Sequence, residues 1–261
     1  MPWKEDERCA PPVVVNAGLN PAHGHLRLDR VPGSKMGNPI HYSLELPQRC
    51  LQLIDELWPA VQRSRQRDRP DLGSLSTTFL ISMSMPIINL PVERLERHKN
   101  STSDGYVDDR HIDTKVSAAV EQVLGGYELK RAPFFVQGEW RFTTRTTPPL
   151  PNIARGLPDA IASQLSTDEA ATRASKMPTS QWCGILRNAM AHGGIAYLDK
   201  NGRSTYGDPV EMLLFASGKF NTDGKLIAVN LLRISESDYR AFLGRWVGWL
   251  VASGVAGQLA A

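Results

Sequence analysis

The hydrophobic pattern of the chain changes its period at one point, the glycine pair Gly193–Gly194. Before this pair, apolar residues recur mainly at steps of three and four, which is typical of amphipathic helices. After it they alternate with polar residues, which is typical of strands with one buried face. A glycine pair is also a strong helix-stop signal, because glycine adopts the left-handed conformation that ends helices. We therefore expect a helical part followed by a short β part.

The part of the chain before the glycine pair is predicted to be helical. Pro59 is expected to kink the first helix, and Pro86 to interrupt the second, which is apolar on nearly all sides and therefore buried. Thr179 or Ser180 is the expected N-cap of the last of these helices. The segment FFVQGEWRF is a candidate strand. The helices are predicted at about 46–67, 74–90, 112–126, 157–165 and 178–192.

The part after the glycine pair predicts two β-hairpins and one closing helix. The stretch IAYLDKNGRSTYG has Asn201–Gly202 at its centre, which is the strongest short hairpin signal. Two further strands, EMLLFAS and KLIAVNLLRI, are joined by a turn, and Ser235 or Ser237 then caps an amphipathic helix. The expected fold class is mainly α, with a small antiparallel β-sheet at about 195–233 inserted before the C-terminal helix.

The first 40 residues are rich in proline and glycine and predict an extended segment packed on the domain. We expect residues 41–261 to form a single helical domain, since 261 residues suit one large domain.

Composition narrows the function only slightly. The formal net charge of +3 is compatible with a polyanionic ligand without requiring one. Three cysteines without a CxxC pair fit a reducing compartment. No signal peptide and no membrane span are recognised, so the chain is expected to be soluble and cytoplasmic.

The pair His23 and His25 lacks a second ligand cluster, so no metal and no cofactor are predicted. GxSxG, P-loop and GxGxxG patterns are absent from the sequence.

The stretch LRNAMAHGG contains the strongest candidate site, made of Arg187, Asn188 and His192. On a helix, Asn188 and His192 lie about 40° apart, whereas Arg187 lies about 140° from His192 and must reach back. A histidine transfers protons near neutral pH, an arginine offers a planar fork of donors to a phosphate, and an asparagine can orient either group. These residue types suit phosphodiester cleavage without a metal.

This stretch resembles the R-polar-x-x-x-H signature of HEPN domains, helical nucleases of toxin–antitoxin, abortive-infection and CRISPR-associated systems. The resemblance covers roughly residues 45–95 and 112–253 and is strongest from 180 to 250. It implies an antiparallel helical bundle that dimerises and brings two motifs together in one cleft. One His192 would then act as base and the other as acid, while both Arg187 side chains hold the phosphate and Asn188 positions it.

The activity implied by this resemblance is a metal-independent endoribonuclease that attacks through the RNA 2′-OH. The implied role is that of a toxin or phage-defence effector, with RNA, a second copy and an antitoxin or regulatory protein as partners. Some HEPN domains only bind or scaffold, so the alternative is a non-catalytic RNA- or nucleotide-binding module. A third possibility is a small-molecule enzyme with a pocket in residues 130–157.

Three further residues are candidate RNA contacts, each with a structural alternative. Arg63 and Arg67 belong to the basic run RSRQRDRP, which could follow an RNA backbone but is explained equally by cations at a solvated helix end. Trp182 could line the dimer cleft, although the tryptophans at helical spacing favour core or interface packing. For the motif itself, the alternative is an ordinary histidine at a helix C-terminus.

Overall fold

The computed structural model describes residues 42–63, 75–97, 114–146, 148, 150, 153, 156–205 and 209–255. The predictions for the N-terminal segment 1–40, for Arg67 and for the His23–His25 pair lie outside these residues.

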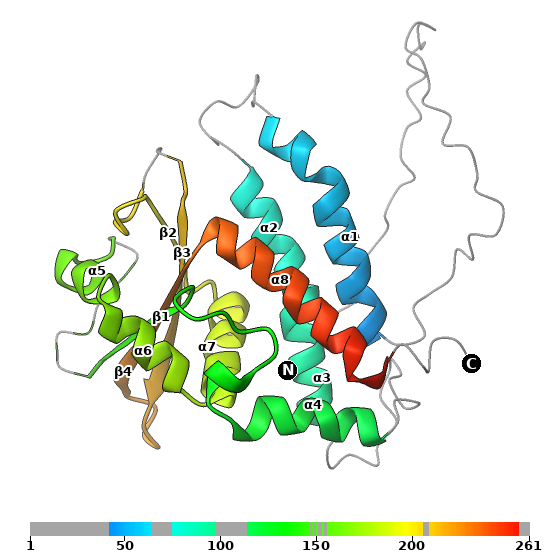
Figure 1. Ribbon diagram of the computed structural model, residues 1–261. Coiled ribbons are helices and arrows are strands. Elements are labelled where there is room, and N and C mark those ends of the chain that lie inside the picture. The colour runs from blue at the N-terminus through cyan, green and yellow to red at the C-terminus, as the bar shows by residue number, and fades with distance from the viewer. Residues whose placement is uncertain are drawn as a thin grey trace, which may run out of the picture. The chain divides into compact units, whose positions relative to one another are not determined.

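The helices predicted from periodicity are present, and one of them is modified at a proline (Figure 1). The first helix runs unbroken through Pro59, whereas the second becomes a π-helical turn that contains Pro86 and then continues as a third helix. A helix that the sequence did not predict, DEAATRASK, buries only alanines and a serine, so no pattern of large apolar residues marks it. The helices are α1 (Tyr42–Arg63), α2 (Ser76–Ser84), η2 (Met85–Asn89), α3 (Leu90–Arg97), α4 (Thr114–Gly126), η3 (Leu129–Arg131), α5 (Asp159–Leu165), α6 (Asp168–Lys176), α7 (Thr179–His192), α8 (Glu236–Leu250) and η5 (Val251–Val255).

The predicted mainly α bundle with an inserted small sheet is wrong: the fold is mixed α and β. Four strands form one antiparallel sheet in the order β1-β4-β3-β2. β1 precedes α5, α6 and α7 in the chain, so the sheet is not an insertion confined to residues 195–233. The strands are β1 (Arg141–Arg145), β2 (Ile195–Leu198), β3 (Met212–Phe220) and β4 (Leu226–Ser235).

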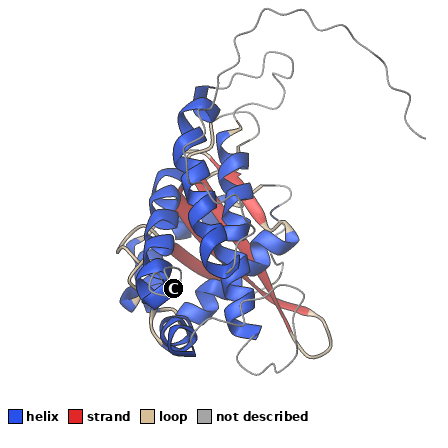
Figure 2. Cartoon of the chain, turned by 90° about the vertical axis from the view of Figure 1, so that its right-hand side faces the viewer, coloured by secondary structure: helices blue, strands red, loops and turns tan. Residues whose placement is uncertain are grey.

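Burial of both sheet faces explains why the β part is larger than expected. In β4, Leu232 and Ile234 belong to the core beneath α7 and α8, whereas Val229 and Leu231 belong to a second cluster with α5. A strand covered on both faces is apolar at nearly every position and needs a strand on each side. β1 supplies the missing neighbour, and Figure 2 shows the helices packed against the strands.

The Asn201–Gly202 turn exists, but the described residues after it, 203–205, do not form one of the strands. Gly202 has φ +75°, and the Asp199 carboxylate accepts hydrogen bonds from the backbone N–H groups of Asn201 and Arg203. After the turn, the Asp199 N–H donates to the Arg203 carbonyl at 2.8 Å, the Thr205 N–H donates to the Tyr197 carbonyl at 3.1 Å, and an isolated bridge joins Leu198 to Ser204. β2 pairs along its length with β3, so the described residues after the turn form a short bridged segment beside it.

Two arginines on the α5 side of the sheet hold the C-terminal end of α5. Arg233 is buried and donates to the Leu165 carbonyl at 2.9 Å, while Arg141, its register partner, donates to the Thr167 carbonyl at 2.6 Å. Burial lowers the pKa of the Arg233 guanidinium, and the nearby Arg141 charge lowers this pKa further. Cations near helix-terminal carbonyls complement the helix dipole, so these side chains attach α5 to the sheet.

The main core is aromatic and lies between α7, α8 and the segment before β1. Trp182 stacks on Phe134, with ring centroids 5.4 Å apart, and contacts Trp140 and Phe242 edge-on. Phe134 and Trp140 come from the candidate strand at 134–142, of which only the last two residues are in β1. Among the described residues, none of the helices has both the length and the apolarity that crossing a bilayer requires.

Candidate functional site

The three motif residues occupy the last two turns of α7. His192 is the final residue of the helix, as the sequence predicts, and Gly193 follows in the left-handed conformation with φ +69°. The N-cap position is taken by Pro178, not by Thr179 or Ser180. The His192 side chain is exposed and makes no hydrogen bond or ion pair with another described residue. It is therefore accessible to a ligand.

Gly194 joins the end of α7 to β3. Its carbonyl accepts from the Ala216 N–H at 2.7 Å, and its own N–H donates to the Ala189 carbonyl at 2.8 Å. A Cβ atom at this position would lie 2.3 Å from the Ala216 carbonyl oxygen. Only glycine allows this approach, so the chain segment next to His192 is fixed against the sheet.

Replacing Gly194 with alanine should lower the free energy of unfolding by about 3 kcal/mol, the upper range for overpacking, because the added carbon meets backbone. Gly193→Ala meets no atom within 4 Å and should lose only about 1 kcal/mol for the left-handed conformation. Urea denaturation measures both. Gly193→Asn is the control, since asparagine tolerates this conformation, and a Gly194→Ala variant as stable as Gly193→Asn would contradict the close contact.

Arg187 is held by a residue of α3. Its Nε lies 3.2 Å from Glu93 Oε1, and the two side chains are 34% and 36% exposed. Asn89 donates to the Arg187 backbone carbonyl at 3.4 Å. The ion pair directs the guanidinium toward α3, and the side chain remains partly exposed.

Asn188 points toward the sheet, not toward α3. Its Nδ2 donates to Ser217 Oγ on β3 at 3.2 Å, and Ser217 is buried. Ser217 is in register with Asn230 of β4, whose Oδ1 accepts from Thr144 of β1 at 2.9 Å. A polar row therefore crosses the sheet beside the end of α7. Within one protomer, Arg187 and Asn188 are held by different elements, and only His192 is left without a described partner.

The two described RNA-contact candidates outside the motif, Trp182 and Arg63, differ in burial. Trp182 is fully buried among aromatic rings, so its assignment as a base-stacking surface is wrong. Arg63 is exposed at the last residue of α1, where its Nε donates to the Pro59 carbonyl at 2.9 Å, as expected for a cation at a helix end.

Two residues whose side chains contact the Arg187 and Asn188 side chains were not found from the sequence, Glu93 and Ser217. Neither has a local pattern that sets it apart, because each meets α7 only through the tertiary fold. Glu93 lies in VERLERHK, which reads as a polar helix turn. Ser217 stands at the end of a strand as one more alternating polar position.

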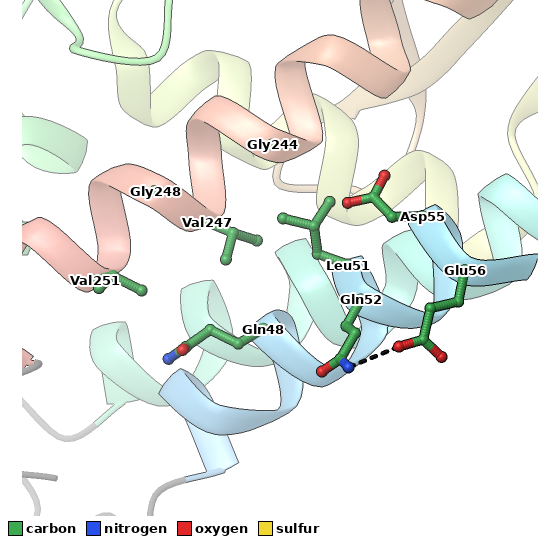
Figure 3. Close-up of a pocket in the computed structure, with 9 residues that line it drawn as sticks. All are labelled: Gln48, Leu51, Gln52, Asp55, Glu56, Gly244, Val247, Gly248 and Val251. Atoms are coloured by element: carbon green, nitrogen blue, oxygen red, sulfur yellow. Dashed lines mark hydrogen bonds between the residues drawn. The ribbon is translucent and has the colours of Figure 1, made fainter. Parts of the chain in front are cut away.

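Three surface grooves lie elsewhere, and none of these three is lined by Arg187, Asn188 or His192. The first, of about 550 Å³, runs between α1 and α8 (Figure 3). Its other side consists of Gly244, Val247 and Gly248 of α8 and Val251 of η5, and its α1 side is mostly polar. A second groove lies between Phe142 and α6. No group of three His, Cys, Asp or Glu side chains converges among the described residues.

Comparison with known proteins assigns no family to the chain. No protein-family model, curated protein or solved structure matches it. The function is therefore inferred from the residues at the end of α7 and their contacts.

Proposed function

We propose that the protein is a metal-independent endoribonuclease whose active site is completed by a second copy of the chain. The observation that carries the proposal is the end of α7, where an exposed His192 follows an arginine held by Glu93 and an asparagine held by Ser217. The motif resemblance to HEPN nucleases supports the same activity. It concerns the motif alone, since the sheet departs from the bundle expected of that family.

The residues at the α7 terminus have the chemistry that RNA cleavage needs. A neutral imidazole takes the proton of the ribose 2′-OH, and the 2′ oxygen attacks phosphorus. The bond from phosphorus to the 5′ oxygen then breaks, and a protonated imidazole supplies the proton to that oxygen. The guanidinium of Arg187 binds the non-bridging oxygens, where negative charge grows in the transition state. The products are a 2′,3′-cyclic phosphate and a 5′-hydroxyl.

A second copy is part of the proposal because one motif supplies one imidazole. Separate base and acid require two, and a two-fold axis through the site brings both from a single sequence. The resemblance extends the proposal to a toxin or phage-defence effector in the cytoplasm, controlled by an antitoxin or regulatory protein.

The direct test is incubation of the purified protein with end-labelled RNA in EDTA. We expect cleavage, with products that carry 2′,3′-cyclic phosphates, and a bell-shaped pH–rate curve because base and acid work together. An RNA whose 2′-hydroxyls are methylated is the matched control substrate and should remain intact. Full-length RNA after incubation at several pH values, or cleavage of the methylated RNA, would contradict the proposal.

A second candidate is a non-catalytic RNA- or nucleotide-binding module, and the Glu93–Arg187 contact favours it. A carboxylate 3.2 Å from the guanidinium competes for the donors that a scissile phosphate requires. RNA binding without cleavage, unchanged in His192→Ala, would support this candidate against the nuclease.

A further inference from the structure

The β3–β4 hairpin extends past the end of α7. β2 begins at Ile195, opposite Phe215, so β3 has no partner on that side as it continues to Phe220. Figure 2 shows strands reaching beyond the helices to a loop. We define the hairpin tip as residues Lys219 to Ile227.

An exposed aromatic ring stands at this tip. Phe220 is 61% exposed, the largest value among the exposed large hydrophobic residues described. Its ring lies against Gly218, where a Cβ atom would be 2.9 Å from Phe220 Cε2. A glycine at this position gives the ring a place to lie flat against the strand while most of its surface stays open.

The hairpin tip is held rigidly by the turn that closes it. Asn221 Oδ1 accepts from the N–H groups of Asp223 at 3.1 Å and Lys225 at 2.8 Å, and Gly224 has φ +73°. A β-bulge at Lys219–Phe220 adds a local bend. Rigid aromatic side chains bind with little loss of conformational entropy. Phe220 is therefore held in place for a ligand before the ligand binds.

Positive charge surrounds Phe220. The cations are Lys219, Lys225 and Arg145, and Arg145 shares a cross-sheet row with Gly218 through Val229, which places its Cα about 10 Å from that of Gly218. None of the three has an ion pair with a described residue. The turn contributes one carboxylate, Asp223, which accepts from the Asn221 side chain. The tip region is therefore cationic and suits a phosphate backbone.

The hairpin tip is also within reach of the α7 terminus. Lys219 is two residues beyond Ser217 and on the same face of β3, the face that contacts Asn188, whereas the Phe220 ring lies against Gly218 on the opposite face. Ala216 donates its N–H to the Gly194 carbonyl, and Phe220 lies about 13 Å further along β3 than Ala216. A single strand of RNA bound at His192 can therefore cross the edge of β3, which β2 leaves unpaired beyond Phe215, to reach the hairpin tip.

We propose that the hairpin tip binds single-stranded RNA beside the scissile phosphate, with one base stacked on Phe220 and phosphates held by Lys219, Lys225 and Arg145. Aromatic stacking combined with a basic strand is how sequence-tolerant RNA-binding surfaces work. The proposal deepens the nuclease function and rests on it for the direction of the strand, but binding is measured independently of cleavage.

The test uses the His192→Ala protein, fluorescein-labelled 12-nucleotide RNA and fluorescence anisotropy. Phe220→Ala should weaken binding about 5- to 150-fold, the range for loss of one stacked base, whereas Phe220→Trp retains it. Ile227→Ala is the matched control, since Ile227 is 41% exposed on the same tip and has no aromatic face. Lys219→Ala should lower the salt dependence of log Kd by about 0.7.

The outcomes separate this proposal from the nuclease function. Unchanged affinity in Phe220→Ala overturns the hairpin site even if the wild-type protein cleaves RNA. Weaker binding in Phe220→Ala supports the hairpin site even if the wild-type protein cleaves nothing. If Phe220→Ala instead alters the oligomeric state in gel filtration and leaves RNA affinity intact, the tip is a protein contact and the proposal fails. No measurable binding of the 12-mer to any form of the protein also overturns it.

Discussion

Replacing His192 with alanine is expected to lower the rate of RNA cleavage by about 10²- to 10⁴-fold, the range for loss of general acid–base catalysis. The midpoint of thermal unfolding should change little. His192 is exposed at the last residue of α7 and makes no hydrogen bond or ion pair with a described residue, so its removal breaks no contact that holds the fold. Cleavage rate and melting temperature, measured on the same preparation, separate a chemical role from a structural one.

Three comparisons sharpen this prediction. Added imidazole should partly restore cleavage to His192→Ala, because it can fill the space left by the side chain and transfer protons. Gln181→Ala, an exposed position on the same helix, should cleave normally. Arg187→Ala should lose activity that imidazole does not restore. A His192→Ala protein with full activity would remove the basis of the proposed mechanism.

The composite site gives the His192 prediction a second readout. If both histidines of a dimer are required, a dimer with one wild-type chain and one His192→Ala chain is inactive. Equal amounts of the wild-type and His192→Ala proteins are mixed and allowed to exchange subunits. The mixture should then have about one quarter of the activity of wild-type protein at the same total concentration, since only that fraction of dimers has two intact chains. A loss of only one half would mean that each chain acts alone.

The helices whose apolar residues keep a helical period could be predicted, but α6 and the extent of the sheet could not. β1 is RFTTR, five residues without an apolar alternation, and it becomes a strand because β4 needs a neighbour on that side. Its pairing residues are about 90 positions away in the chain. Non-local pairing of this kind leaves little local trace, and the mainly α prediction failed for that reason.

The motif of the candidate site was visible in the sequence, whereas its surroundings were not. Spacing alone put Asn188 and His192 on one face of a helix that ends at Gly193, and the helix does end there. Glu93 and Ser217 meet this helix only through packing of α3 and β3, so no spacing rule could find them. Trp182, in contrast, was a candidate from the sequence that the fold places in the core, since an aromatic residue near a motif is more often part of the core.

Replacing Trp182 with alanine should lower the free energy of unfolding by about 3–5 kcal/mol, the cost of deleting a fully buried aromatic side chain. The ring is 0% exposed and packs on Phe134, Trp140 and Phe242, so no neighbour can fill the space without moving the core. If Trp182 instead stacked on RNA bases, the same substitution would weaken RNA binding and leave stability nearly unchanged. Urea denaturation and RNA anisotropy on one set of proteins distinguish these roles.

Trp246 provides a matched comparison for Trp182, because both indoles are fully buried in the same core and differ in one hydrogen bond. The Trp182 Nε1 has no partner among the described residues, whereas the Trp246 Nε1 donates to the Ile87 carbonyl at 2.9 Å. Pro91, four residues on, has no N–H to give that carbonyl, and the indole supplies it with a donor.

Phenylalanine at each position tests the energetic value of this bond. Trp182→Phe removes a buried donor that had no partner, whereas Trp246→Phe leaves the Ile87 carbonyl buried without its donor. We expect Trp246→Phe to cost about 1–3 kcal/mol more than Trp182→Phe, the penalty for an unsatisfied buried polar group. Equal losses would mean that the Ile87 carbonyl finds another donor within the π-helical turn. A larger loss for Trp182→Phe would mean that its indole N–H has a partner in solution.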